Sequence, residues 1–304
     1  MKIDRSKAIP FGMLILVALI WGLDPIVNSY LYKSYSAAAL SALSTLLSAC
    51  VFFLFSVKKL RLLNRSYLTV ALPIALLNSL ACLLQRIGLQ YTTPAKYSFL
   101  EHLSCVTVPL LLLFFFRKRP SPRQWLASAL CLGGCLFLTG AGAQLRSLGV
   151  GELLCATSGI LFGISIVATG IYAQGLELGL FMMIHMLTYF LTSVGMAVGL
   201  HTITNGGQPI ERFVFSTEPL PLLAGILFGF LSVGVCWLLR TEAARRLSPA
   251  TVASVMPFSA VISGMVSVLV GYDHLTPSFL LSSAMIVTGA ILSGLEDTKK
   301  SSLL

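Results

Sequence analysis

The chain has 304 residues, of which 56% are hydrophobic and only 11% are charged. A soluble domain averages about 45–50% apolar and about 25% charged residues, so this composition excludes a water-soluble globular protein. The formal net charge of +10 by itself suggests nucleic-acid binding, but the positions of the basic residues favour a different explanation, given below.

Apolar stretches of about 20 residues, the length that crosses a bilayer core of about 30 Å, recur along the whole chain. We predict an all-α membrane protein with ten transmembrane helices. The connections between them are short except for 201–218 and leave no room for a separate soluble domain. The predicted spans are 9–30, 36–57, 67–90, 95–116, 123–141, 149–171, 178–200, 219–240, 249–270 and 276–294.

The basic residues indicate how these spans are oriented. With a cytoplasmic N-terminus, sixteen of the 21 Lys and Arg residues lie in inner segments. Only Lys33, Lys96, Arg146 and Arg212 lie outside, and Arg86 is inside a span. Cytoplasmic loops carry an excess of Lys and Arg, so we expect both termini in the cytoplasm. This distribution explains the basic charge without a nucleic-acid partner.

The most informative pattern is an internal repeat. Residues 94–134 begin Pro-Ala, run through about 20 apolar residues, pass a short polar turn with Pro120 and end in Gly, and 249–289 repeat this course after a shift of 155 positions. The predicted halves are 1–146 and 147–304. Five spans in each half turn the second half upside down relative to the first. Transporters use such inverted repeats for alternating access, with the substrate between the halves.

Four ionisable residues lie in the outer halves of spans one, three and four: Asp24, Arg86, Glu101 and His102. Each charge at the bilayer centre costs about 2.5–3.5 kcal/mol, so these residues are candidates for function. One interpretation is a buried pair between Arg86 and a carboxylate that joins two helices. The remaining carboxylate would then bind a proton or a substrate amine. For His102, proton relay and simple capping of a neighbour both remain open.

The surroundings of Asp24 favour a binding site for an amine. Pro25 removes one helical hydrogen bond and frees the carbonyl of Trp21. The indole ring of Trp21 attracts ammonium groups. The alternative is that Trp21 only packs against lipid or another helix, although its mid-span position is unusual for tryptophan.

Weaker candidates for the lining of a cavity are polar side chains within spans three, four and seven. Polar groups in membrane helices often serve only as hydrogen-bonded contacts between helices, and that alternative applies here. Trp237 and Arg240 fall at the predicted inner end of span eight, where we expect them to anchor the helix. The candidates are Asn78, Gln85, Tyr97, His185 and Tyr189.

The sequence offers little support for a cofactor, a metal site or catalysis. The seven cysteines all fall inside predicted spans, which argues against a disulfide framework. Cys131 and Cys135 share a helix face, where close helix packing is favoured over metal binding. The His-Glu-x-x-His and Gly-x-Ser-x-Gly patterns of enzymes are absent. An intramembrane enzyme and a structural or receptor protein are the alternatives to a transporter.

Several segments together resemble the drug/metabolite transporter superfamily, specifically its EamA-type ten-span branch. They are GLQYTTPAKYSFL at 88–100, FRKRPSPRQWLASALCLGGCLFLTG at 116–140, EAARRLSPATVASVMPFSAVISGMVSVL at 242–269 and the Ile20-Trp21-Gly22 start. The resemblance implies a ten-helix inverted repeat, a central cavity and transport of small metabolites, often as export.

The sequence therefore predicts a secondary active transporter in the plasma (inner) membrane that exports or exchanges a small metabolite. An amine-bearing substrate, such as an amino acid or an organic cation, is favoured by the buried carboxylates. No Walker motif occurs, so protons, another coupling ion or the gradient of the substrate itself drives transport.

Overall fold

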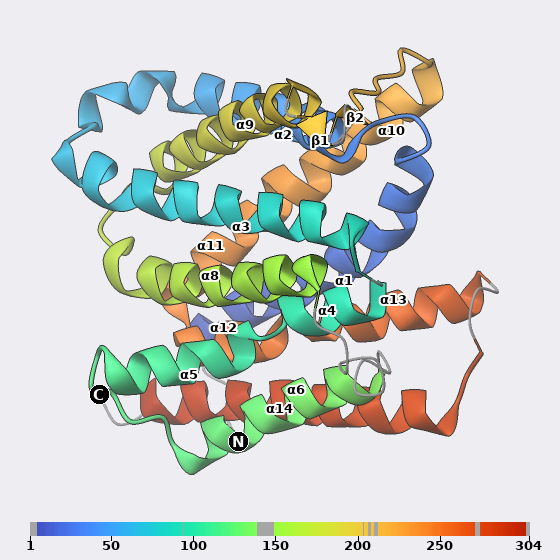
Figure 1. Ribbon diagram of the computed structural model, residues 1–304. Coiled ribbons are helices and arrows are strands. Elements are labelled where there is room, and N and C mark those ends of the chain that lie inside the picture. The colour runs from blue at the N-terminus through green and yellow to red at the C-terminus, as the bar shows by residue number, and fades with distance from the viewer. Residues whose placement is uncertain are drawn as a thin grey trace.

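The computed structural model describes residues 5–92, 94–138, 149–202, 204–205, 208–209, 212–270 and 274–301 (Figure 1). The predicted boundary between residues 146 and 147 lies outside these ranges. The elements are α1 Arg5–Leu31, α2 Ala37–Ser56, η1 Val57–Leu62, η2 Tyr67–Ala71, α3 Leu72–Gln90, α4 Pro94–Glu101, α5 Ser104–Phe114, α6 Pro122–Leu138, α8 Val150–Tyr172, α9 Leu178–Thr202, β1 Thr204–Asn205, β2 Gln208–Pro209, α10 Pro219–Gly229, η3 Phe230–Val235, α11 Cys236–Arg246, α12 Pro249–Val255, α13 Phe258–Leu269 and α14 Pro277–Ser301.

Apolar helices account for nearly all of the described chain. In lipid every backbone polar group must be bonded within the protein, which long apolar helices achieve. Eight helical segments in the described ranges are long and apolar enough to cross a membrane, and they coincide with eight of the ten predicted spans. The other two spans correspond to the broken pair α4–α5, with a shorter apolar stretch at Phe99–Phe114, and to the 17-residue α6. The count of ten spans therefore stays a prediction.

Two predicted spans are interrupted at corresponding points. The fourth breaks between α4 and α5 at His102 and Leu103, and the ninth breaks between α12 and α13 at Met256 and Pro257. His102 and Pro257 are 155 residues apart, the shift of the sequence repeat. Proline explains the second break because it lacks an N–H for the helix. Pro109, in contrast, lies inside the continuous helix α5.

The helices pack in pairs that recur between the two copies of the repeat. α2 packs against α9 at one edge of the bundle and α6 packs against α14 at the opposite edge (Figure 1). Between these edges α3 packs against α8, and α1 packs in the same way against α11. Likewise, α1 packs against α13 as α8 packs against α5.

Glycines mark the closest of these contacts. A Cβ on Gly134 would lie 2.6 Å from Ile286 Cγ1, and a Cβ on Gly289 would lie 2.6 Å from Cys131 Sγ. Gly134 and Gly289 are 155 residues apart, and so are Cys131 and Ile286. The α6–α14 contact is therefore made twice with exchanged partners, and Cys131 takes part in it as a packing residue.

A second pair of glycines repeats a different contact. A Cβ on Gly22 of α1 would lie 2.6 Å from Ile262 Cβ in α13, and a Cβ on Gly163 of α8 would lie 2.9 Å from Thr107 Cβ in α5. Thr107 and Ile262 are again 155 residues apart. Small residues at such points let helix backbones approach closely in membranes.

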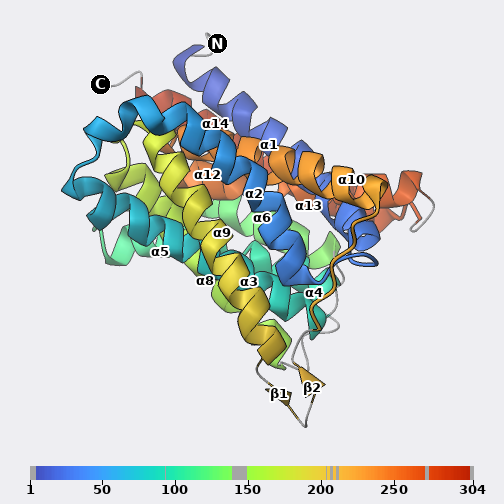
Figure 2. The same ribbon diagram turned by 90° about the horizontal axis from the view of Figure 1, so that it is seen from above.

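The start of α1 and the end of α14 lie at the same end of the bundle, away from β1 and β2 (Figure 2). The two strands form an antiparallel pair with Thr204 opposite Pro209, within the predicted long connection 201–218. After this pair, the chain bonds to the α1–α2 connection, where Ser36 N donates to Val214 O. Tyr35 Oη also donates to Ser216 O at 3.0 Å.

At the end of the bundle where α1 begins, the connection between α8 and α9 is held from two sides. Lys59 Nζ lies 2.6 Å from Glu177 Oε1. Arg245 Nη2 donates to the backbone oxygens of Gln174 and Leu176, at 2.7 and 2.8 Å. These contacts tie the ends of α2, α8, α9 and α11 together.

We expect Val substitutions at Gly134 and at Gly289 to lower the thermal stability of the purified protein by similar amounts. Overpacking of this kind typically costs about 1–3 kcal/mol. The control is Gly195→Val in α9, because a Cβ at Gly195 meets nothing within 4 Å. Melting temperatures in detergent measure the effect. A loss at Gly195→Val as large as at the two contact glycines would contradict this assignment.

The Lys59–Glu177 contact predicts a pH dependence of stability. Partial burial alone raises the pKa of Glu177, but hydrogen bonds from Lys59 and from the Leu180 and Gly179 N–H groups outweigh it and hold the pKa below its ordinary value. The ionised carboxylate therefore stabilises the fold above the pKa of the unfolded chain, about 4.3, and this contribution is lost as pH falls through the folded-state pKa.

Glu177→Gln should therefore lower the melting temperature at pH 7, by the equivalent of at most about 1 kcal/mol for such an exposed pair. The difference from wild type should vanish at acid pH, where the wild-type carboxyl is itself neutral. The matched control is Glu218→Gln, since Glu218 is exposed and belongs to no described ion pair. A difference that persists unchanged into acid would refute the electrostatic origin.

Candidate functional site

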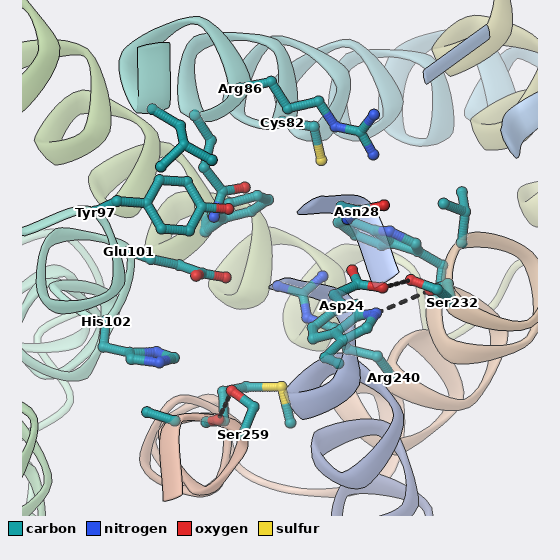
Figure 3. A pocket seen from close by; sticks show the side chains of 18 of the residues that line it. Asp24, Asn28, Cys82, Arg86, Tyr97, Glu101, His102, Ser232, Arg240 and Ser259 are labelled. Carbon is teal, nitrogen blue, oxygen red and sulfur yellow. Dashed lines mark hydrogen bonds between the residues drawn. The ribbon is translucent and has the colours of Figure 1, made fainter. Parts of the chain in front are cut away.

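A cavity of about 350 Å³ lies in the middle of the bundle, where both interrupted helices break (Figure 3). Glu101 and His102 line it from the α4–α5 break, and Met256 and Ser259 line it from the α12–α13 break. The cavity brings together most of the predicted site residues. These are Trp21, Asp24, Gln85, Arg86, Tyr97, Glu101, His102 and Tyr189.

Asp24 and Trp21 of α1 are both bonded to Ser232 of the π-helical segment η3. Ser232 Oγ donates to Asp24 Oδ1 at 2.7 Å, and Trp21 Nε1 donates to the Ser232 carbonyl at 2.9 Å. The Trp21 ring also packs edge-on against Trp237, with ring centroids 5.9 Å apart. Trp21 thus faces the cavity and other helices. No sequence pattern singled out Ser232, whose position depends on the irregular turn of η3.

Two other charged side chains of the cavity meet neutral partners. Glu101 hydrogen-bonds to the side chain of Gln85, and Arg86 Nη1 donates to Ser41 Oγ of α2. Within the described part of the chain, no ion pair joins Arg86 to Asp24 or Glu101. The side chain of Arg86 therefore joins α3 to α2 through a hydroxyl, and both carboxylates remain available inside the cavity.

Arg240 supplies a second positive charge to the cavity, although the sequence placed this residue at the inner end of span eight. The prediction that Trp237 and Arg240 anchor the end of span eight is wrong, because both line the cavity and are nearly fully buried. The helix does not end at residue 240 but continues as α11 to Arg246. The cavity lining thus holds two carboxylates and two guanidinium groups.

Asn78 and His185 lie beside the cavity and do not line it. Asn78 Oδ1 accepts a hydrogen bond from Ser165 Oγ of α8. His185 is fully buried, and its ring lies edge-on to Trp237 with centroids 4.6 Å apart. Neither of its ring nitrogens has a hydrogen-bond partner among the described residues.

The internal repeat extends to the cavity itself. CLLQR at 82–86 recurs as CWLLR at 236–240, a shift of 154 residues. This shift relates Arg86 to Arg240 and also relates Asn78 to Ser232. The two arginines thus hold equivalent positions in α3 and α11, and both line the cavity.

Two hydrogen bonds between helices are related in the same way. Ser232 bonds to Asp24 of α1, and Asn78 bonds to Ser165 of α8. Asp24 and Ser165 are 141 residues apart, the same separation as Gly22 and Gly163. The Ser232–Asp24 bond involves a carboxylate that lines the cavity, whereas the equivalent Ser165–Asn78 bond joins two neutral, buried side chains. The chemistry of the site is therefore asymmetric within a nearly symmetric framework.

Comparison with known proteins now identifies the type of protein. Residues 9–140 match the sequence model of the EamA-like transporter family. The match confirms the resemblance to the drug/metabolite transporter superfamily and indicates a multi-pass membrane transporter of that type. Members of the family are transporters rather than enzymes.

Among solved structures, one described as "Crystal structure of protein" is similar in fold to this chain, with a TM-score of 0.75 and 17% sequence identity. The likeness covers 97% of this chain and 100% of the other. The comparison with curated proteins gives no match. At this identity the structural likeness concerns the fold alone.

The position of Asn78 predicts a role in joining helices. Asn78→Ala should lower the melting temperature, by the equivalent of about 0.6–1.7 kcal/mol as for similar membrane hydrogen bonds. Ser165→Ala should lower it by a similar amount. The melting temperature of the double variant should fall little further than that of either single variant, because both substitutions remove the same hydrogen bond. Fully additive losses in this cycle would show that the two side chains do not depend on each other.

Proposed function

We propose that this protein is a secondary active transporter that moves a small metabolite through the central cavity by alternating access. The proposed architecture is a ten-helix inverted repeat with halves 1–146 and 147–304 in the plasma membrane, both termini being cytoplasmic. The repeated contacts of α6 with α14, of α1 with α13 and of α8 with α5 support this arrangement. The excess of basic residues in the predicted inner segments supports the orientation.

The observation that carries the proposal is the position of the cavity at the two helix breaks. Transporters with inverted repeats bind substrate near the bilayer midplane, where discontinuous helices in corresponding positions of the halves expose polar groups. Here the breaks at His102 and at Pro257 are related by the repeat, and residues from both border the cavity. Four charged side chains around one small cavity inside the bundle fit a substrate site better than a scaffold.

The cavity lining also favours one conformation of the transport cycle. It extends to Tyr32, Leu89 and Tyr97, near the ends of α1 and α3 and the start of α4. At the opposite end of the bundle, the Lys59–Glu177 contact and the bonds from Arg245 hold the helix ends together. With a cytoplasmic N-terminus this is an outward-facing state.

The carboxylates support recognition of an amine. Asp24 accepts only one hydrogen bond from the described side chains, from Ser232, and it lies beside the Trp21 ring. A substrate ammonium between Asp24 and Glu101 would meet both carboxylates and an aromatic face. The same carboxylates offer a binding place for protons or another coupling ion, which exchange against the metabolite would use.

The test is a transport assay with the full chain in proteoliposomes. Amino acids and primary amines are loaded, and an inward or outward pH gradient is imposed. Asp24→Asn and Glu101→Gln should each reduce gradient-driven flux by about tenfold or more, because a charge-assisted contact is typically worth about 1.5–3 kcal/mol. Their folding is checked by size-exclusion chromatography and melting temperature.

The matched control for this assay is Glu218→Gln, an exposed carboxylate outside the cavity, which should transport like wild type. Wild-type flux in both cavity variants would eliminate the carboxylate mechanism. Absence of flux in the wild type for every probe, with or without a gradient, would count against transport of amine-bearing metabolites.

A further inference from the structure

Arg240 is held in the cavity by aromatic rings instead of by an acid. Its guanidinium carbon lies 4.6 Å from the centroid of the Trp237 ring and 5.9 Å from that of the Phe162 ring. The residue is 6% exposed. In Figure 3 it approaches the cavity from the side of Asp24 and Ser232, opposite Glu101 and His102. The two rings stabilise the positive charge and fix the orientation of the guanidinium.

Among the residues that the structure describes, the N–H groups of Arg240 find no acceptor. An arginine carries five N–H donors, and no hydrogen bond or ion pair of this side chain occurs within the described ranges of the chain. Its electrostatic interaction with Glu101 acts through space. The nitrogens of Arg240 are not among the fully enclosed, unpartnered side-chain atoms of the described chain. They therefore reach the cavity, where a ligand or water supplies the acceptor that a charged donor requires.

The equivalent arginine of the other repeat differs in this respect. Arg86 has Ser41 Oγ as an acceptor on the neighbouring helix α2, whereas Arg240 has no such partner in the part of the chain that the structure describes. The repeat therefore places two arginines around one cavity, with one tied to the framework and the other directed only to the cavity. The difference identifies Arg240 as the one available to the substrate.

We propose that Arg240 determines substrate specificity by binding a carboxylate group of the substrate. This inference rests on the proposed transport function and extends it. A planar guanidinium matches a carboxylate through two parallel N–H···O bonds. With Asp24 and Glu101 ionised, the four cavity charges sum to zero, and a ligand without net charge preserves that balance. The substrate would then place its amine against Asp24 and Glu101 and its carboxylate against Arg240. Such a substrate is a small zwitterion.

The test measures binding of three matched probes to the purified full chain by thermal shift and calorimetry. Leucine carries both charged groups, isoamylamine lacks the carboxylate, and 4-methylpentanoate lacks the amine. We repeat the series with phenylalanine, phenethylamine and 3-phenylpropanoate. The wild type should bind at least one amino acid about tenfold or more tighter than its amine, the ratio expected for a charge-assisted contact.

Arg240→Gln should weaken binding of the amino acid by about tenfold or more and leave binding of the amine nearly unchanged. The preference for the amino acid over the amine should then disappear. Arg240→Lys keeps the positive charge but lacks the planar guanidinium with its two parallel donors, so the ratio of amino-acid to amine affinity should be intermediate. If Arg240→Gln does not fold, the lysine variant decides the question. The control Arg246→Gln lies on the same helix outside the cavity and should keep the wild-type ratio.

Three results would overturn the assignment: equal binding of amine and amino acid by the wild type, equal weakening of both by Arg240→Gln, or no binding of any probe. The first would leave amine transport standing and remove only the role of Arg240. Conversely, tight Arg240-dependent binding of the acids without need of the amine would support Arg240 and count against amine recognition.

Discussion

Charged side chains inside a membrane protein must find partners in the protein or in a water-filled cavity, because lipid does not solvate them. In this chain Asp24, Arg86, Glu101 and Arg240 meet this requirement in one cavity, without a direct ion pair among them. Hydroxyl, amide and aromatic neighbours hold each charge in place. Opposite charges are thus kept apart within a small volume, and such an arrangement is complementary to a ligand that carries opposite charges of its own.

The broken helices make this arrangement possible. A continuous helix would place Glu101 and His102 on a regular face, with their backbone groups bonded internally. The break between α4 and α5 and its equivalent between α12 and α13 bring polar residues of both repeats to the same cavity. The π-helical segment η3 does the same for Ser232. Irregular backbone inside a membrane is tolerated where it borders a cavity or is buried in protein, which is where it occurs here.

The repeat supplies a framework that is nearly symmetric, and the side chains make its chemistry asymmetric. The α6–α14 contact is formed twice by residues related by the 155-residue shift, with glycine at both closest points. Shifts of 141 and 154 residues likewise relate Asp24 to Ser165 and Arg86 to Arg240, yet these residues have different partners. A symmetric framework suits two alternative states of similar energy, whereas the proposed recognition of a polar substrate depends on the asymmetric charges.

The sequence by itself determined the membrane location, most helix boundaries, the 155-residue repeat and the presence of buried charges. These features depend on local hydropathy and on spacing along the chain, because the thickness and apolarity of the bilayer fix the length and composition of each span. Most residues singled out as polar within spans, such as Asp24 and Glu101, also border the cavity. Only the tertiary structure decided that Arg240 belongs there, that Arg86 bonds to Ser41 and that Asn78 and His185 lie outside. Those outcomes depend on how far each helix continues and how it is rotated against its neighbours, and packing between helices, not hydropathy, sets both.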